Sequence, residues 1–92
     1  ESPAIPVIDI LKENGADVEF FDPYISSFKE NGIVMEGIPS IDGDIIAQYD
    51  LVMITCGHTN VDYDMIQKNA KAIFDTKNVM QGIANRENIE VL

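Results

Sequence analysis

Two short stretches hold the residues whose types and spacing could do chemistry, Thr55–His58 and Asp75–Asn78. In the first, a cysteine thiol lies two residues from an imidazole, and such a pair could form an activated nucleophile. The second offers the ammonium group of Lys77, which could reach a phosphate or a carboxylate. Each stretch follows an apolar run, so the chemistry depends on where those runs end in space.

More ordinary roles for these side chains stay open. Cys56 has no recognisable third group to orient a catalytic pair, and cysteine is among the most buried residue types, so we expect it packed or half-buried. His58, the only histidine, could brace its turn through a hydrogen bond or contact a ligand. Lys77 could be a solvated lysine or could contact a ligand or a second subunit.

Other polar groups do not complete a known kind of site. A calcium loop needs a longer ladder of oxygen ligands than Asp42/Asp44 or Asp62/Asp64 provides, and one cysteine with one histidine is too few for structural zinc. We predict no metal site and expect surface carboxylates and helix caps. None of the six glycines forms the G-x-G-x-x-G loop of dinucleotide sites. Asp22, before a proline, is expected to start a turn through its side chain.

The elements that must position these groups alternate along the chain. The first half predicts a helix over 3–14 capped by Ser2 and stopped by Gly15, with Ile10 widening its apolar face. A strand over 17–22, a helical turn over 26–30 within a turn-rich connection, and a short strand over 33–35 follow. The second half predicts a helix over 41–48 capped by Ser40 and another over 63–69 capped by Asp62 or Asn60. Its strands are expected over 51–55, 72–74 and 89–92.

This order indicates an α/β protein. The continuous apolar run over 51–55 is typical of a strand buried on both faces of a parallel sheet. We predict one domain over residues 1–92 with a three-layer α/β/α Rossmann-like parallel sheet. The helix near residue 3 would pack on a strand that precedes it, so we expect the sheet to be truncated at its first strand. Ligands bind such sheets beyond the carboxyl ends of the strands, where residues 22–24, 55–58 and 75–78 would lie.

The charge balance excludes two classes of partner. Sixteen acidic residues face six basic ones, a formal net charge of -10, so we expect neither nucleic acid nor an anionic membrane as a partner. No apolar run approaches the roughly 18 residues needed to cross a bilayer. A single cysteine excludes an internal disulfide and is consistent with a reducing compartment, so we expect a cytoplasmic location.

Four short motifs, in this order along the chain, carry a family resemblance: ESP at 1–3, G-A-x-V-x-x-x-D-P-Y at 15–24, D-L-V-M-I-T-x-x-H at 50–58 and F-D-T-K-N at 74–78. Together they resemble the carboxyl-terminal, UDP-binding domain of the UDP-glucose/GDP-mannose dehydrogenase family, over nearly the whole chain. Within the family, the sequence looks more like the bacterial and archaeal N-acetyl-hexosamine dehydrogenases than the animal UDP-glucose enzymes.

The resemblance implies a division of labour. A parent enzyme would oxidise the C6 hydroxyl of a UDP-sugar to a carboxylate with two NAD, in polysaccharide biosynthesis and as a homodimer. NAD and the catalytic cysteine and lysine would belong to other parts, so residues 1–92 alone are expected to be inactive. Lys77 falls where many members have arginine in D-x-R-N, and it would bind the substrate together with Asp75, Thr55 and His58.

Two functions of other classes remain as alternatives. The words YDLVMIT resemble a strand of a flavodoxin-like receiver domain, and Lys77 could imitate the lysine after a later strand. However, Thr55 would stand at the phosphoacceptor position, and the acidic pair of a receiver's first strand is absent from the sequence. A stand-alone interaction module without catalysis is the other alternative.

Overall fold

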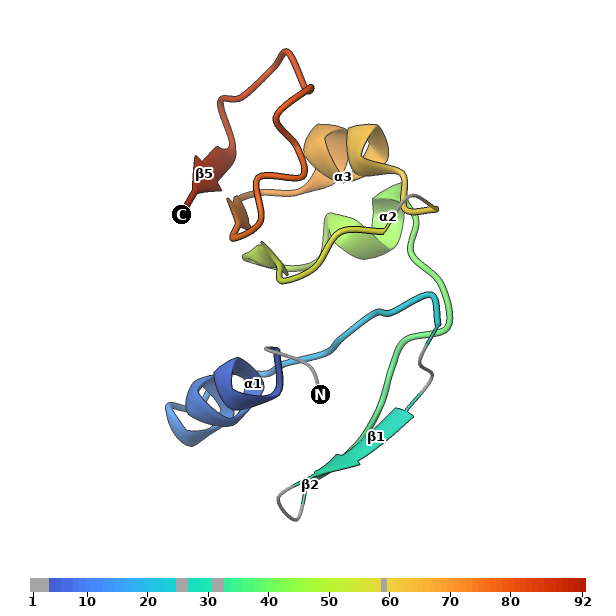
Figure 1. Ribbon diagram of the computed structural model, residues 1–92, viewed down its shortest axis with the longest axis vertical. Helices are drawn as coiled ribbons and strands as arrows, with labels where there is room; N and C mark the ends of the chain where they lie inside the picture. The colour runs from blue at the N-terminus through green and yellow to red at the C-terminus, as the bar shows by residue number, and fades with distance from the viewer. Residues whose placement is uncertain (1–3, 25–26, 31–32, 59) are drawn as a thin grey trace. The chain divides into compact units, whose positions relative to one another are not determined.

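A computed structural model describes residues 4–24, 27–30, 33–58 and 60–92 (Figure 1). The chain divides into two compact units: an amino-terminal unit, residues 1–40, and a carboxyl-terminal unit, residues 41–92. Among the described residues, no helix is both long and apolar enough to cross a membrane.

The amino-terminal unit begins with helix α1, Ala4–Glu13. Gly15 adopts a φ of +87°, and its N–H donates to the carbonyl of Lys12 at 3.0 Å, so this glycine ends the helix as predicted. The predicted cap Ser2 lies outside the described residues. Ile8 is buried whereas Ile10 is 58% exposed, so the prediction that Ile10 widens the apolar face is wrong. Successive helical residues turn by about 100°, which puts Ile10 nearly opposite Ile8.

The predicted strand over 17–22 does not form, because these residues belong to neither sheet. The segment has the residue composition of a strand, but a strand exists only where a neighbouring strand continues the hydrogen-bond ladder. A backbone hydrogen bond of 2.9 Å, from the Ile38 N–H to the Phe20 carbonyl, joins this segment to residues beyond the hairpin described next.

A β-hairpin completes this unit. Strand β1, Ser27–Glu30, pairs antiparallel with β2, Ile33–Glu36, so that Ser27 faces Glu36 and Glu30 faces Ile33. The predicted strand over 33–35 is confirmed. The predicted helical turn over 26–30 is wrong over the described residues 27–30, since the ladder with β2 holds them extended.

The carboxyl-terminal unit starts with α2, Gly43–Ile46, which is shorter than the predicted helix over 41–48. Its cap is Asp42 and not Ser40, because an Asp42 carboxylate oxygen accepts the Ile45 N–H at 2.9 Å. The helix ends early because the Gln48 N–H bonds three residues back, to the Ile45 carbonyl, at 3.1 Å. Helix α3, Tyr63–Asn69, has the predicted bounds and the predicted cap, Asp62.

The sheet of this unit has three parallel strands in the order β3-β4-β5: Val52–Ile54, Ile73–Asp75 and Ile89–Val91. Helix α3 connects β3 to β4, as a parallel pair requires. A buried core joins the helices to the sheet and comprises Ile46, Ile54, Ile66, Ala70, Ile73 and Met80. The α/β Rossmann-like fold class is thereby confirmed, while the three-layer form and the truncation at a first strand stay predictions.

Candidate functional site

The carboxyl ends of β3 and β4 bring the two chemistry-bearing stretches to one edge of the sheet. The register places Ile54 opposite Asp75, so residues 55–58 and 76–80 leave the sheet at the same level. Thr76 ties the two together, because its N–H and its hydroxyl both donate to the Ile54 carbonyl, at 3.0 and 2.6 Å. The expected convergence of the two stretches is therefore observed.

The two loops also pack against each other through a position without a side chain. A Cβ built on Gly57 would lie 2.8 Å from Cγ1 of Val79, closer than carbon atoms tolerate. The Val79 side chain thus occupies the space that any larger residue at position 57 would need. This contact fixes the spacing between the loop after β3 and the loop after β4.

Asp75 organises the second loop from inside. Its side chain is fully buried, and Oδ1 accepts the N–H groups of Lys77 and Val79, both at 3.2 Å, while Oδ2 accepts the N–H of Met80 at 2.9 Å. Asn78 takes a φ of +54°, which lets the chain curl around the carboxylate. The Met80 side chain, 0% exposed, anchors the end of the loop in the core.

Of the four predicted binding residues, Lys77 is the one with an exposed side chain. The Lys77 N–H donates to the Asp75 carboxylate, which fixes the backbone position from which the side chain extends into solvent. Thr55, directly after β3, is half-buried. Direct contact of these residues with a ligand stays a prediction, as it does for Asp75 and His58.

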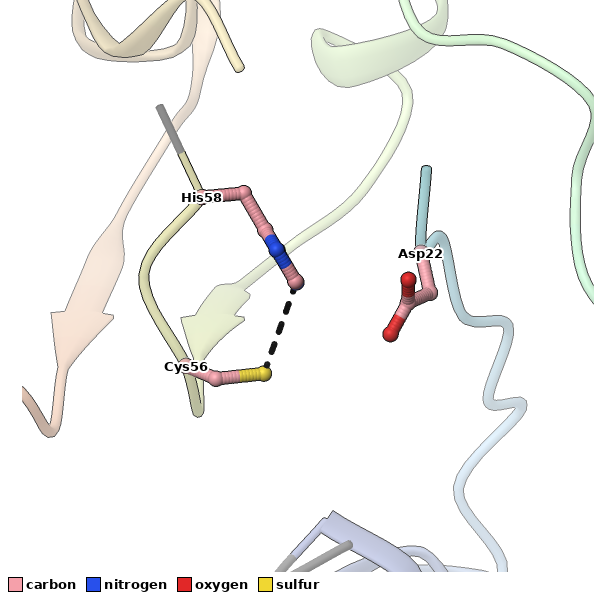
Figure 2. Close-up of side chains that lie close together, drawn as sticks. All are labelled: Asp22, Cys56 and His58. Atoms are coloured by element: carbon pink, nitrogen blue, oxygen red, sulfur yellow. Dashed lines mark hydrogen bonds between the residues drawn. The ribbon is translucent and has the colours of Figure 1, made fainter. Parts of the chain in front are cut away.

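Cys56 and His58 lie side by side on the loop after β3, with 3.7 Å between Sγ and Nε2 (Figure 2). Cys56 is exposed, so the expectation of a packed or half-buried thiol is wrong. The chain bends at this residue directly beyond the sheet, which turns the side chain away from the core. The main chain of His58 braces the loop, because its N–H donates to the Tyr63 hydroxyl at 2.9 Å.

The third predicted stretch, residues 22–24, belongs to the amino-terminal unit. There the Asp22 carboxylate accepts the Tyr24 N–H at 2.8 Å, so Asp22 starts a turn through its side chain, as predicted.

The described residues between β3 and α3 do not match the phosphate-binding loop of an NAD site. A dinucleotide loop needs glycines that let the backbone approach a pyrophosphate. Between β3 and α3 the described chain has one glycine, Gly57, and Val79 fills the space beside it. Helix α3 begins at a carboxylate cap, Asp62, which already accepts the Met65 N–H and whose negative charge disfavours a phosphate there.

Several residues that shape this edge escaped the sequence reading. Met80 and Val79 lie in a segment without periodicity, so no pattern marks them as packed. The guanidinium of Arg86 donates to the carbonyls of Met80, at 2.8 Å, and Ile83, at 3.3 Å, and thereby holds the turn that follows the loop. The Asp75 carboxylate followed by a short polar turn was the available signal, since aspartate commonly accepts backbone N–H groups just downstream.

Comparisons with known proteins agree with the geometry. The family model of the UDP-glucose/GDP-mannose dehydrogenase family, UDP binding domain, matches residues 1–82. Searches of the curated proteins and of the solved structures gave no significant match. The matched region includes both loops described above. The chain therefore belongs to the UDP-glucose/GDP-mannose dehydrogenase family and carries its UDP-binding domain.

Proposed function

We propose that the edge formed by the loops after β3 and β4 binds the UDP part of a nucleotide sugar. The observation that carries the proposal is the convergence of residues 55–58 and 76–80 beyond the carboxyl ends of parallel strands, where open α/β sheets bind ligands. The family match supports the choice of ligand.

Each residue at the edge has a role in this proposal. Lys77 supplies a positive charge for the diphosphate, which a chain of net charge -10 otherwise disfavours. Thr55 and His58 line the wall formed by the neighbouring loop, whose position is set by the contact of Gly57 with Val79. The exposed side chain of Lys77 can adjust its position to bind the ligand, whereas its backbone N–H is hydrogen-bonded to Asp75.

The parent enzyme would be an NAD-dependent UDP-sugar 6-dehydrogenase, with an N-acetyl-hexosamine nucleotide as its substrate class. It would work in the cytoplasm as a homodimer, in polysaccharide biosynthesis. In this proposal, NAD and the oxidation chemistry belong to other domains of that enzyme. This chain would contribute substrate binding and would not turn over substrate by itself.

Kinetics of Lys77 variants in the intact dehydrogenase test the proposal. Lys77→Ala should raise KM for the UDP-sugar about tenfold and leave KM for NAD within about twofold, because a lost charge-assisted hydrogen bond is worth roughly 1.5–3 kcal/mol. Lys77→Arg should stay close to the wild type, since the charge is kept.

Lys71→Ala is the matched control. Lys71 is equally an exposed lysine but precedes β4, at the opposite edge of the sheet. Its loss should leave both KM values unchanged. An unchanged KM for the nucleotide sugar in Lys77→Ala would contradict the proposed contact.

A further inference from the structure

We infer that Asp75 is a positioning residue that acts on the nucleotide sugar through Lys77 and does not touch the ligand itself. The inference rests on the proposed function and assigns to Asp75 a task different from that of its neighbours at the same edge.

The Asp75 carboxylate is not accessible to a ligand. The Asp75 side chain is 0% exposed, so a ligand arriving from solvent meets the residues around it. Its carboxylate would also repel the phosphates of a diphosphate if the two were in contact. Burial beneath the loop removes the carboxylate from the ligand's path.

Asp75 already occupies backbone N–H groups of the loop after β4. Successive N–H groups that curl around a residue of positive φ form a concavity that commonly binds anions. Here the loop has that form, with Asn78 at a φ of +54°, but the anion is the protein's own Asp75 carboxylate. The N–H groups of Lys77, Val79 and Met80 are therefore engaged and cannot serve a phosphate.

Within this loop the cationic group left for a diphosphate is the Lys77 ammonium, and the residue that fixes its backbone is Asp75. Substrate binding by the loop should therefore depend on Asp75 only when Lys77 is present.

A double-mutant cycle in the intact dehydrogenase measures that dependence. Asp75→Asn keeps the shape of the side chain but presents an amide NH₂ to one of the N–H donors, so the loop loses part of its support. We expect KM for the UDP-sugar to rise about fivefold with kcat within about twofold, because the lost interaction serves binding. In a Lys77→Ala background the same change should alter KM less than about twofold.

Two further variants separate positioning from general loss of structure. Asp42→Asn makes the same chemical change at a carboxylate that also accepts a backbone N–H, at the cap of α2, and should leave KM unchanged. Asn78→Ala strains the loop at its positive φ without touching Asp75, and should raise KM only when Lys77 is present. Asn78→Gly should keep the wild-type KM, because glycine adopts a positive φ without strain.

The outcomes are distinguishable. If Lys77→Ala raises KM but Asp75→Asn does not, or if the two effects multiply, the positioning role is wrong while the proposed function stands. If Asp75→Asn does not fold, the Asn78 variants decide by the same criterion. If the wild-type enzyme fails to use nucleotide sugars, the proposed function and this inference both fall.

Discussion

The two units of the chain differ in how they hold their elements. In the carboxyl-terminal unit, six buried residues from both helices, two strands and a loop form one core, and capping carboxylates begin both helices. In the amino-terminal unit, among the residues whose burial the structure describes, Ile8 in α1 and Met35 in β2 are buried hydrophobics. A site needs rigid support, and the candidate site stands on the continuous core of the carboxyl-terminal unit.

This difference predicts which side-chain truncations lower the free energy of unfolding most. Met80→Ala should have the largest effect, because it removes a fully buried side chain at the point where the loop after β4 enters the core. We expect a loss of about 3 kcal/mol in the free energy of unfolding, within the range for methionine truncation in cores. Urea denaturation followed by circular dichroism measures it.

Val34→Ala in the amino-terminal unit is the comparison. Val34 is 67% exposed on β2, so its truncation should change the free energy of unfolding by less than about 0.5 kcal/mol. Equal costs at the two positions would contradict the placement of Met80 in a tightly packed core.

A smaller effect should come from the contact between the two loops. Gly57→Ala would place a Cβ 2.8 Å from Cγ1 of Val79, a branched side chain with little freedom to move. Overpacking of this kind costs about 1–3 kcal/mol.

Val79→Ala tests whether the clash with Val79 is the reason that Gly57→Ala destabilises the protein. In a Val79→Ala background the space beside position 57 is open, so Gly57→Ala should cost less than about 0.5 kcal/mol. The same free energies of unfolding, measured for the four members of the cycle, decide this. An undiminished cost would show that backbone freedom at Gly57, and not the packing of the loops, sets the requirement.

Local signals predicted the carboxyl-terminal unit well. Helix α3 has the predicted bounds because both signals that define it are local in sequence. Its cap, Asp62, directly precedes the helix, and its buried residue, Ile66, lies within it. The apolar run before Thr55 predicted a parallel strand, which β3 confirms. The predicted burial on both faces is wrong, because β3 lies at the edge of the three described strands and only Ile54 in it is buried. The convergence of the loops followed from strand direction alone.

What failed depended on pairing or on side-chain orientation. The segment 17–22 has strand composition, but a ladder needs a neighbour that composition does not reveal. The hairpin of β1 and β2 had an unused signal in the sequence, Asn31-Gly32 between the strands, which is a strong hairpin dipeptide. The exposure of Cys56 and the burial of Asp75 reflect the path of loops, which no periodic pattern encodes.

The most direct test of the central claim is a titration of this chain with UDP, followed by ¹⁵N–¹H NMR. The account predicts weak, saturable shifts at the amides of residues 56–58 and 77–80, on the loops after β3 and β4. It predicts little change in the open groove at the amino ends of the strands, which Leu51, Lys71 and Glu87 help to line. Shifts concentrated in that groove, or none at either edge at millimolar UDP, would contradict the account.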